Sequence, residues 1–551
     1  MDVGSEHEND KRIPFQTQRG GRWPHLGEEL SNIIEGYARG SLILLIGQTA
    51  STAVNAAGVI LLARFLGAEG YGLVVLATIP VSLIALLSDL GVSAAMTRFI
   101  AHYRSEGRGE VWPIMKAGII FNMSVGGILF ISSFLLSSYI AEGVFHRPEV
   151  AGLIKVASTT LLSNSLLISC QSIFVGFDRM ELHSLTSMVF SILKSTIAPI
   201  LALSGYGVFG ALVGNAASTA ASGVISLSMV LKILRGSPRV ASPGARGTIR
   251  MLLGFGYPLF LSSLLTGGIS HLYNLLLAMS VEASIIGNYQ AALNFSVLIN
   301  LLTMPITTVL FPLFSRFDAD DAALIILFRA SVKYSALLIV PATLGLILVS
   351  DQLVGIVYGG SFQLAPFFLR LYSLNFLFAG LGSVSIGSLL NGQGKTKVTF
   401  NTNLIYICIG MPMGLLLIPR MGVTGLLLTI LFASKPGLFY ALWWVRRNLG
   451  LTLDWAASAK IYLSSAIAYL IPLFILSNLD LSYWRGLFLG LITLPPVYSL
   501  LLTLTRALDE ADIRALKIMV KAVGPLAPIL RLLMILIDIP IRKKRSNQLG
   551  D

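Results

Sequence analysis

The chain has 551 residues, of which 55% are hydrophobic and only 12% are charged. Soluble proteins carry about 25% charged residues, so this composition excludes a set of soluble domains and predicts an all-α protein that crosses a membrane many times. The formal net charge of +13 does not by itself indicate nucleic-acid binding, because membrane proteins gather basic residues in the loops of one face.

The N-terminal region is polar, and the first apolar run begins only near Leu42. We therefore expect no cleavable signal peptide. Residues 1–36 are predicted to form a disordered cytoplasmic tail.

Fourteen apolar segments follow, each close to the roughly 20 residues that a membrane-spanning helix needs. The first six lie at 42–63, 72–96, 114–139, 152–175, 183–203 and 208–231. The next six lie at 253–279, 285–313, 324–349, 364–390, 398–418 and 422–445, and two more at 460–477 and 486–505. The sequence thus predicts about fourteen transmembrane helices joined by short connections.

Lysine and arginine are concentrated in the N-terminal tail, in the loops after the second and sixth spans, and in the C-terminal segment. The opposite face has only Arg64, Arg147, Lys155, Arg420 and Arg485. Because basic loops stay in the cytoplasm, we expect both termini there, in a multi-pass protein of the cell (plasma or inner) membrane. We expect no nucleic-acid partner.

The C-terminal segment 509–551 is apolar but interrupted by charges and prolines, and it carries the basic run "RKKR" at 542–545. We expect amphipathic helices at the cytoplasmic interface, followed by a basic tail. The alternative is a span near 525–541, which would place the basic run on the wrong side.

An internal repeat relates the two halves of the chain at an offset of 215–216 residues. Three landmarks in the same order carry it: "LLARFLGAEGYG" at 61–72 with "LLAMSVEASIIGNY" at 276–289, "GYGVFGALVG" at 205–214 with "RMGVTGLLLT" at 420–429, and "GFDRMEL" at 176–182 with "GQGKTKV" at 392–398. Six spans separate the copies, and an even number preserves orientation. The halves are therefore predicted to be parallel repeats that face each other across a cavity, as in alternating-access transporters.

This repeat divides the chain into lobes. We expect an N-lobe over 37–235, a basic cytoplasmic linker over 236–250 and a C-lobe over 251–447. Two additional spans follow within 458–506.

Two motifs that suggest an enzyme are rejected. "NGQGKTK" (391–397) lacks the first glycine of a phosphate-binding loop, because position 389 is Leu389. "FDADD" (317–321) contains the D-x-D of some glycosyltransferases but has no room for a catalytic domain. The two cysteines, Cys170 and Cys408, lie in apolar runs, so a disulfide framework or metal cluster is not expected. We predict a protein that is not an enzyme and needs no cofactor or metal.

The stretch at 61–103 resembles the polysaccharide-biosynthesis, or oligosaccharide flippase (Wzx-like), branch of the multidrug/oligosaccharidyl-lipid/polysaccharide (MOP) exporter superfamily. The resemblance lies in the R-x-L-G-x-x-x-Y-G turn (Arg64, Leu66, Gly67, Tyr71, Gly72), in D-L-G (Asp89, Leu90, Gly91) and in the following Arg98. Glycines before spans 6 and 12 and a count of twelve plus two spans are also similar, so the resemblance covers about 37–505.

The resemblance implies a two-lobe, MATE-like fold with a V-shaped cavity lined mainly by spans 1, 2, 7 and 8. It also implies a monomeric flippase that moves polyprenyl phosphate- or pyrophosphate-linked glycans to the outer face, in contact with membrane lipids and glycan-assembly proteins. Energy would come from an ion gradient or the membrane potential. The alternative is a MATE-type drug/cation antiporter, but such proteins often hold a cavity carboxylate, and spans 1 and 7 contain none. A non-transporting scaffold or enzyme subunit is a third alternative.

Charged residues at membrane depth are functional candidates, because burying them is costly. Lys435, Lys194 and Arg370, together with Arg64 at the end of span 1, are candidates to bind an anionic head group. Each could instead pair with a neighbour or extend to the interface. Asp89 and Arg98 are expected to pair with each other structurally or to take part in gating.

Amide, hydroxyl and imidazole side chains on spans 1, 7 and 8 are candidates for sugar contact: Gln48, Asn55, His271, Tyr273, Asn274, Asn288, Gln290 and Asn294. The alternative for the set is hydrogen bonding between helices, which is common in membranes. His271 could also carry a proton.

Overall fold

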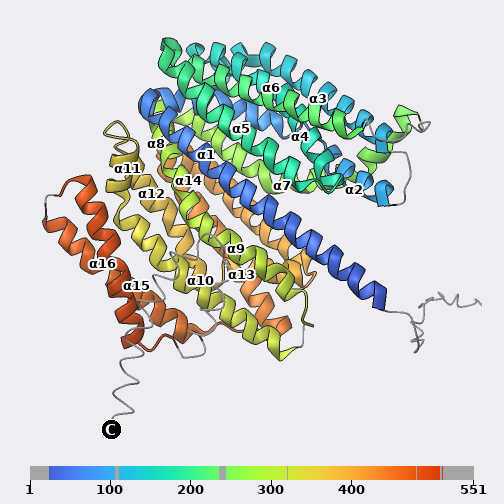
Figure 1. Cartoon of the computed structure of the whole chain (residues 1–551). Helices are drawn as coiled ribbons and strands as arrows, with labels where there is room; N and C mark the ends of the chain where they lie inside the picture. The colour runs from blue at the N-terminus through green and yellow to red at the C-terminus, as the bar shows by residue number, and fades with distance from the viewer. Residues whose placement is uncertain are drawn as a thin grey trace, which may run out of the picture.

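The computed structural model describes residues 24–105, 111–234, 244–318, 321–479, 481–508 and Asp512. In these ranges every regular element is a helix, and the helices form two bundles (Figure 1). The predicted all-α fold is therefore confirmed for the described chain.

The first bundle contains six α-helices and three short helical turns. They are α1 (Pro24–Ala85), α2 (Val92–Ser105), α3 (Val111–Tyr139), η1 (Ile140–Val144), η2 (Pro148–Val150), α4 (Ala151–Gly176), α5 (Met180–Leu201), η3 (Ala202–Tyr206) and α6 (Gly207–Leu234). Helix α1 packs on α5, α3 on α4, and α4 on α6.

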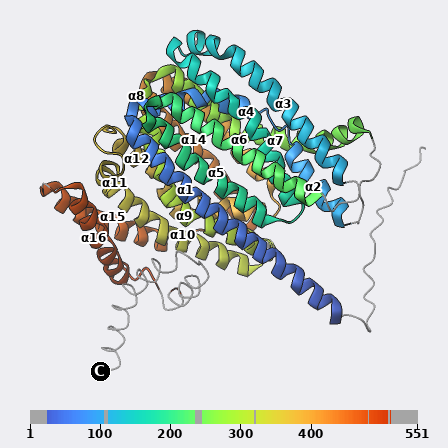
Figure 2. The ribbon, with the colours of Figure 1, turned by 45° about the horizontal axis from the view of Figure 1, so that its top comes forward.

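The second bundle contains the remaining helices. They are α7 (Ala245–Ser280), α8 (Ala283–Asn294), α9 (Ser296–Phe314), α10 (Ala322–Leu348), α11 (Ser350–Val357), α12 (Ala365–Ser373), η4 (Leu374–Leu381), α13 (Ser385–Gly392), α14 (Thr396–Leu449), α15 (Trp455–Asn478) and α16 (Tyr483–Leu504). Helices α15 and α16 pack on each other and on α10 and α11, at the edge of this bundle (Figures 1 and 2).

Nine helices of the described chain are long and apolar enough to cross a membrane, or up to eleven if each of two bent helix pairs counts as one span. The sequence predicted fourteen. The difference arises because three of these stretches, Gly47–Ala85, Met180–Ile233 and Thr396–Leu449, each contain two predicted spans.

These three stretches are broken at glycines with positive φ: Gly67 (69°), Gly205 (96°), Gly207 (51°) and Gly422 (57°). Only glycine adopts such conformations without strain. Packing shows that α14 folds back on itself, because Gly437 lies against Thr402 and Gly410 lies against Ala433. The chain can thus turn sharply within each long stretch, and helical hydrogen bonding is interrupted for only a few residues around the glycine.

Two predicted boundaries are corrected. Helix α1 begins at Pro24, so 24–36 is helical rather than disordered. Its apolar residues at 26, 30, 33, 34 and 37 have helical spacing. Helix α7 begins at Ala245, inside the predicted linker. Apart from Asp512, the predicted interfacial segment lies outside the described residues.

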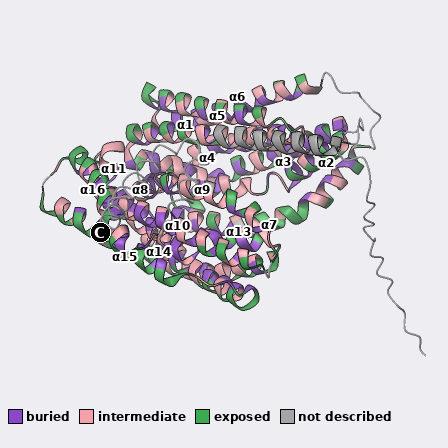
Figure 3. Ribbon diagram, turned by 60° about the horizontal axis from the view of Figure 1, so that its bottom comes forward, coloured by how far each residue is buried: buried purple, intermediate pink, exposed green. Residues whose placement is uncertain are grey.

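Small residues let the helices approach closely, as is usual in membranes. In the first bundle Gly47 packs on Ser184, and Gly58 packs on Ser195. Large apolar side chains point outward, for example Leu135 and Phe474, which are 73% and 72% exposed. Figure 3 shows buried residues where helices meet and exposed residues on their outward faces.

Candidate functional site between the two bundles

The two bundles meet most closely where the second half of α1 crosses α8. Gly72 lies against Ala283, and Gly287 lies against Ala68. The contact is reciprocal, because Ala68 and Gly72 are related to Ala283 and Gly287 by the same offset of 215. Such reciprocity is what a two-fold axis imposes on an interface. We call this end of the bundles the Gly72 end.

Hydrogen bonds reinforce the Gly72 end. Asn294 Nδ2 donates to the hydroxyls of Tyr71 (3.2 Å) and Tyr358 (3.0 Å). Arg147 donates to the carbonyl of Val281 at 2.9 Å, and Arg64 donates to the carbonyl of Ile356 at 3.4 Å. All these bonds except Asn294–Tyr358 join one bundle to the other, so this end is closed.

The opposite end, the Gly91 end, is built by the D-L-G motif. Leu90 and Gly91 have φ values of 46° and 79°, which end the helical run after α1 and start α2. Asp89 does not pair with Arg98. Its Oδ1 accepts from the backbone N–H of Ser93 (2.8 Å) and from Asn122 Nδ2 (3.2 Å), so it caps α2.

Helix α2 contacts α7 at the Gly91 end. Gly91 lies against the backbone of Gly256, and the Arg98 guanidinium lies 4.3 Å from the centroid of the Phe255 ring. This cation–π contact explains why Arg98 needs no carboxylate. The two bundles thus touch at both ends through backbone or ring contacts.

Helix α7 belongs to the second bundle but contacts both bundles. It is bent by 47° between Arg246–Leu264 and Gly267–Ser280. The first half packs on α2 through Gly256, and the second half packs on α14, where Tyr273 lies against Gly410 and Gly414. His271 Nδ1 lies 3.4 Å from Ser82 Oγ, so the second half also reaches α1 midway between the two ends.

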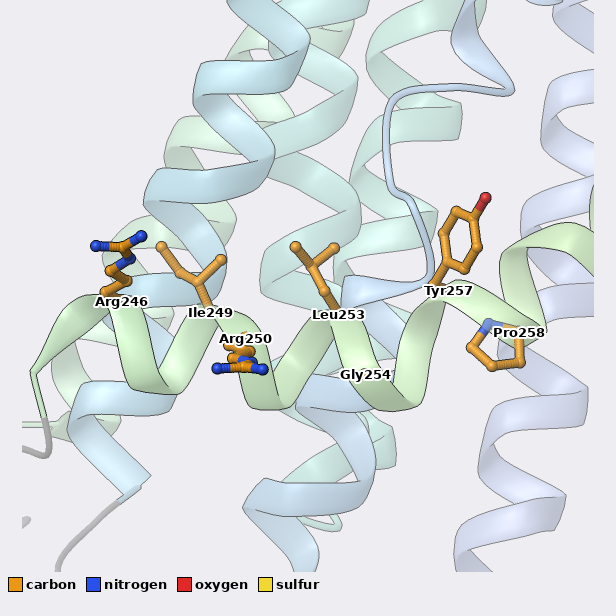
Figure 4. Close-up of a pocket in the computed structure, with 7 residues that line it drawn as sticks. All are labelled: Arg246, Ile249, Arg250, Leu253, Gly254, Tyr257 and Pro258. Atoms are coloured by element: carbon orange, nitrogen blue, oxygen red, sulfur yellow. The ribbon is translucent and has the colours of Figure 1, made fainter.

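An open pocket of about 630 Å³ runs along the first half of α7. Figure 4 shows its lining: Arg246, Ile249, Arg250, Leu253, Gly254, Tyr257 and Pro258. Two arginines lie at one end of this otherwise mainly apolar surface.

The predicted membrane cations do not converge on one point. Lys435 donates to Asn375 Oδ1 at 3.2 Å and lies 3.7 Å from the Phe378 ring centroid, within the second bundle. Lys194 lies on α5 of the first bundle, 5.7 Å from the Phe190 ring centroid. Arg370 forms an ion pair with Asp351 and donates to Ser350 Oγ at 2.7 Å, so it fastens α12 to α11.

The predicted sugar-contact residues have different surroundings. Asn288 Oδ1 accepts from the backbone N–H groups of Leu364 and Ala365 and therefore caps α12. Asn55 Oδ1 is buried and has no hydrogen-bond partner among the described residues. Gln48 is exposed, while Asn274 and Gln290 are partly buried.

The sequence does not indicate the pocket arginines as site residues, because Arg246 and Arg250 fall within the predicted linker 236–250. The signal that would have found them is the helical spacing that Ile249, Leu253 and Tyr257 continue toward the membrane. Tyr358 and Arg147 were missed because their partners lie far away in the chain. The arrangement offers donors and cations that could bind an anion.

A model of the family described as "Polysaccharide biosynthesis protein" matches residues 37–318, and one described as "Lipid II flippase MurJ" matches residues 249–492. Lipopolysaccharide biosynthesis protein WzxC of Escherichia coli (strain K12) is 25% identical over 358 residues, which are 64% of this chain and 69% of that protein. The probable low-salt glycan biosynthesis flippase Agl15 of Haloferax volcanii is 22% identical over 152 residues, 27% of this chain and 32% of that protein.

Solved structures show a similar fold. Lipid II flippase MurJ in an inward closed conformation superposes with a TM-score of 0.67 at 16% identity, covering 84% of this chain and 99% of that one. An inward-facing multidrug resistance MATE family transporter of the MOP superfamily gives 0.55 at 16% identity, covering 73% and 94%. At these identities the likeness concerns the fold alone.

Proposed function

Since this chain belongs to the polysaccharide biosynthesis protein family of the MOP superfamily, as its resemblance predicted, and is therefore a multi-pass membrane protein and not an enzyme, we propose that it is a flippase for a lipid-linked glycan. It moves a polyprenyl phosphate- or pyrophosphate-linked oligosaccharide from the cytoplasmic to the outer face of the cell membrane. The observation that carries this proposal is the family match over 37–318. That region contains most of the residues that join the two bundles at both ends.

We propose that the chain crosses the membrane fourteen times and consists of two parallel six-helix repeats plus α15 and α16. Support comes from the three long stretches broken at glycines. Counted as two crossings each, they raise eleven spans to fourteen. The reciprocal contact of Gly72 and Gly287 supports the two-fold relation of the repeats.

Transport would occur by rocking of the two bundles, with the Gly72 end and the Gly91 end opening in turn. We place the Gly72 end outside and both termini in the cytoplasm, in agreement with the distribution of lysine and arginine. The closed Gly72 end corresponds to a state that does not open outward. The protein acts as a monomer.

Within the pathway we assign head-group attraction to Lys435 and Lys194, because both are basic residues within spans and neither is paired with a carboxylate among the described residues. Lys435 has an amide oxygen and a ring as its neighbours, and Lys194 has a ring. Arg64 and Arg370 act at the Gly72 end, where their partners are a carbonyl and a carboxylate. His271 faces α1 across the bundle interface and is the best placed of the predicted sugar contacts.

The experiment that tests this function is depletion of the protein in its own cell, followed by extraction of lipid-linked glycans and an assay of their sidedness. We expect them to accumulate on the cytoplasmic face while the finished surface glycan disappears, and their mass identifies the cargo. Unchanged lipid-linked glycans together with altered sensitivity to cationic dyes would instead indicate a drug/cation antiporter.

A further inference from the structure

The pocket along α7 occupies one face of the helix. Arg246, Arg250, Gly254 and Pro258 recur every four residues, and Ile249, Leu253 and Tyr257 directly precede the last three of them, which places the lining in a single stripe. The opposite face is buried. Thr248 is 3% exposed and Leu252 is 0% exposed, and Gly256 lies against the backbone of Gly91. The stripe itself stays open, with Tyr257 52% exposed.

Charge is concentrated at one end of this stripe. Arg246 and Arg250 are exposed and lie one helical turn apart. Within the described chain neither forms an ion pair, since the three ion pairs found there involve other residues. Their Cβ atoms are separated by about 6 Å. Of the other five lining residues, Ile249, Leu253, Gly254 and Pro258 are apolar, and Tyr257 adds a ring with a hydroxyl.

We propose that this stripe is the docking site for the lipid part of the substrate, before the substrate enters between the bundles. The pyrophosphate binds Arg246 and Arg250, and the polyprenyl chain lies along Ile249, Leu253, Tyr257 and Pro258. This inference rests on the proposed function and adds a location to it.

Charge and shape favour this occupant over a bulk phospholipid. Arg246 and Arg250 start one helical turn apart on α7, so both flexible side chains can reach one doubly charged head group, and arginine binds phosphate oxygens in pairs. The apolar part of the stripe is only one helix wide, which suits a single chain better than two acyl chains. The site lies on the half of α7 that precedes its bend, beyond which His271 faces α1.

The test is native mass spectrometry of the full-length protein with a synthetic polyprenyl pyrophosphate as the probe. Phosphatidylglycerol and inorganic pyrophosphate serve as competitors. The variant Arg246→Ala/Arg250→Ala is compared with Lys116→Ala/Lys232→Ala, which removes two exposed positive charges from α3 and α6.

We expect the arginine variant to bind the probe at least roughly tenfold more weakly, because it removes both cations that would face the anionic head group. The control variant should bind as the wild type does. Tyr257→Ser should lower the affinity for the polyprenyl pyrophosphate probe but leave the affinity of the competing inorganic pyrophosphate unchanged.

The docking site is wrong if the arginine variant binds the probe normally, or if the control variant loses as much binding. It is also wrong if phosphatidylglycerol displaces the probe at equal concentration, which would indicate an ordinary lipid contact. Because the readout is binding, it fails separately from the proposed function. Normal sidedness of lipid-linked glycans after depletion would contradict the proposed flippase function. Normal probe binding by the arginine variant would contradict only the docking site on α7.

Discussion

Asn294 ties three segments of the chain together at the Gly72 end. Its amide nitrogen donates to Tyr71 of α1 and to Tyr358 at the end of α11, and all three residues lie among buried aromatic rings. Without the Asn294 amide, the buried hydroxyls of Tyr71 and Tyr358 would lose this donor, and an unsatisfied buried polar group is costly. Asn294 therefore stabilises the closed state of this end more than it contributes to either bundle alone.

Asn294→Leu should open the Gly72 end more often. Of its two hydrogen bonds only the one to Tyr71 joins the bundles, and a net value of about 1 kcal/mol corresponds to roughly a fivefold rise in the open population. The measurement is labelling of Phe362→Cys by a membrane-impermeant maleimide, in a background lacking Cys170 and Cys408. Phe362 is 1% exposed and packs against Tyr71.

The matched control for this experiment is Asn448→Leu, because Asn448 donates only to Trp444 of its own helix. Equal labelling of the two variants would contradict the role of Asn294 in stabilising the closed Gly72 end.

Lys435→Ala should lower the flipping rate by roughly tenfold or more while folded protein is obtained in near-normal yield, because charge-assisted bonds are worth about 1.5–3 kcal/mol. Its contacts are to Asn375 and the Phe378 ring, so removing the ammonium strands no carboxylate among the described residues. The rate is measured by sidedness of lipid-linked glycans. Lys460→Ala, at an exposed lysine bound to the carbonyl of Arg506, is the control, and normal flipping by the Lys435 variant would remove Lys435 from the pathway.

At the scale of the element, the long helices depend on their glycine breaks. Gly422 has φ 57° and ψ −130°, a conformation that only glycine adopts readily. Its hydrogen also faces Val281, whose methyl carbon would lie 3.0 Å from an added Cβ. The reversal of α14 is thus fixed by backbone conformation and by contact with Val281, the residue that follows α7.

Gly422→Ala should destabilise the protein by about 1–3 kcal/mol, seen as a lower melting temperature in detergent. Gly387→Ala is the control, since Gly387 lies in helical α13 with nothing within 4 Å of an added Cβ. It should be neutral or slightly stabilising. A fall in melting temperature shared by both variants would contradict the explanation.

The sequence could predict where the apolar segments lie, because hydrophobic runs report burial and lipid contact directly. It could not predict how they bend. The tenth segment contains a 3₁₀ stretch, Leu374–Leu381, and a break before Ser385, while the eighth is divided at Phe295. Such breaks depend on backbone conformation and packing, which apolar periodicity does not record.

The candidate site was harder to predict than the fold. Asn288 and Asn294 looked alike as amides on one span, yet the first caps α12 and the second bridges to Tyr71. Sequence alone cannot tell an amide that satisfies a backbone from one that faces an interface. The family motif was more informative, because Tyr71 and Gly72 lie at the junction and Arg64 reaches across it.

For the whole molecule, the Gly72–Gly287 contact should decide whether the two bundles can close. We expect Gly72→Leu/Gly287→Leu to lengthen the distance between spin labels on Glu149 and Gln363 by several ångströms, because each new side chain meets backbone of the other bundle. Both labelled positions are exposed. Pulsed electron resonance measures the distance.

The control for the double leucine variant is Gly152→Leu, since nothing lies within 4 Å of a Cβ added there. An unchanged distance in the double leucine variant would mean that the outer closure does not depend on this crossing.

The same crossing also bears on how such a chain can evolve. In a dimer of two identical six-helix halves, Gly72 and Gly287 would be one codon, and any substitution would enter both sides of the contact at once. Once the halves are fused, each glycine can mutate alone, so that a side chain meets the backbone of the other bundle at one of the two points only. Fusion therefore allows the two sides of the Gly72–Gly287 contact to differ. Such a difference would let the closure of one end of the protein change independently of the symmetry that a dimer imposes.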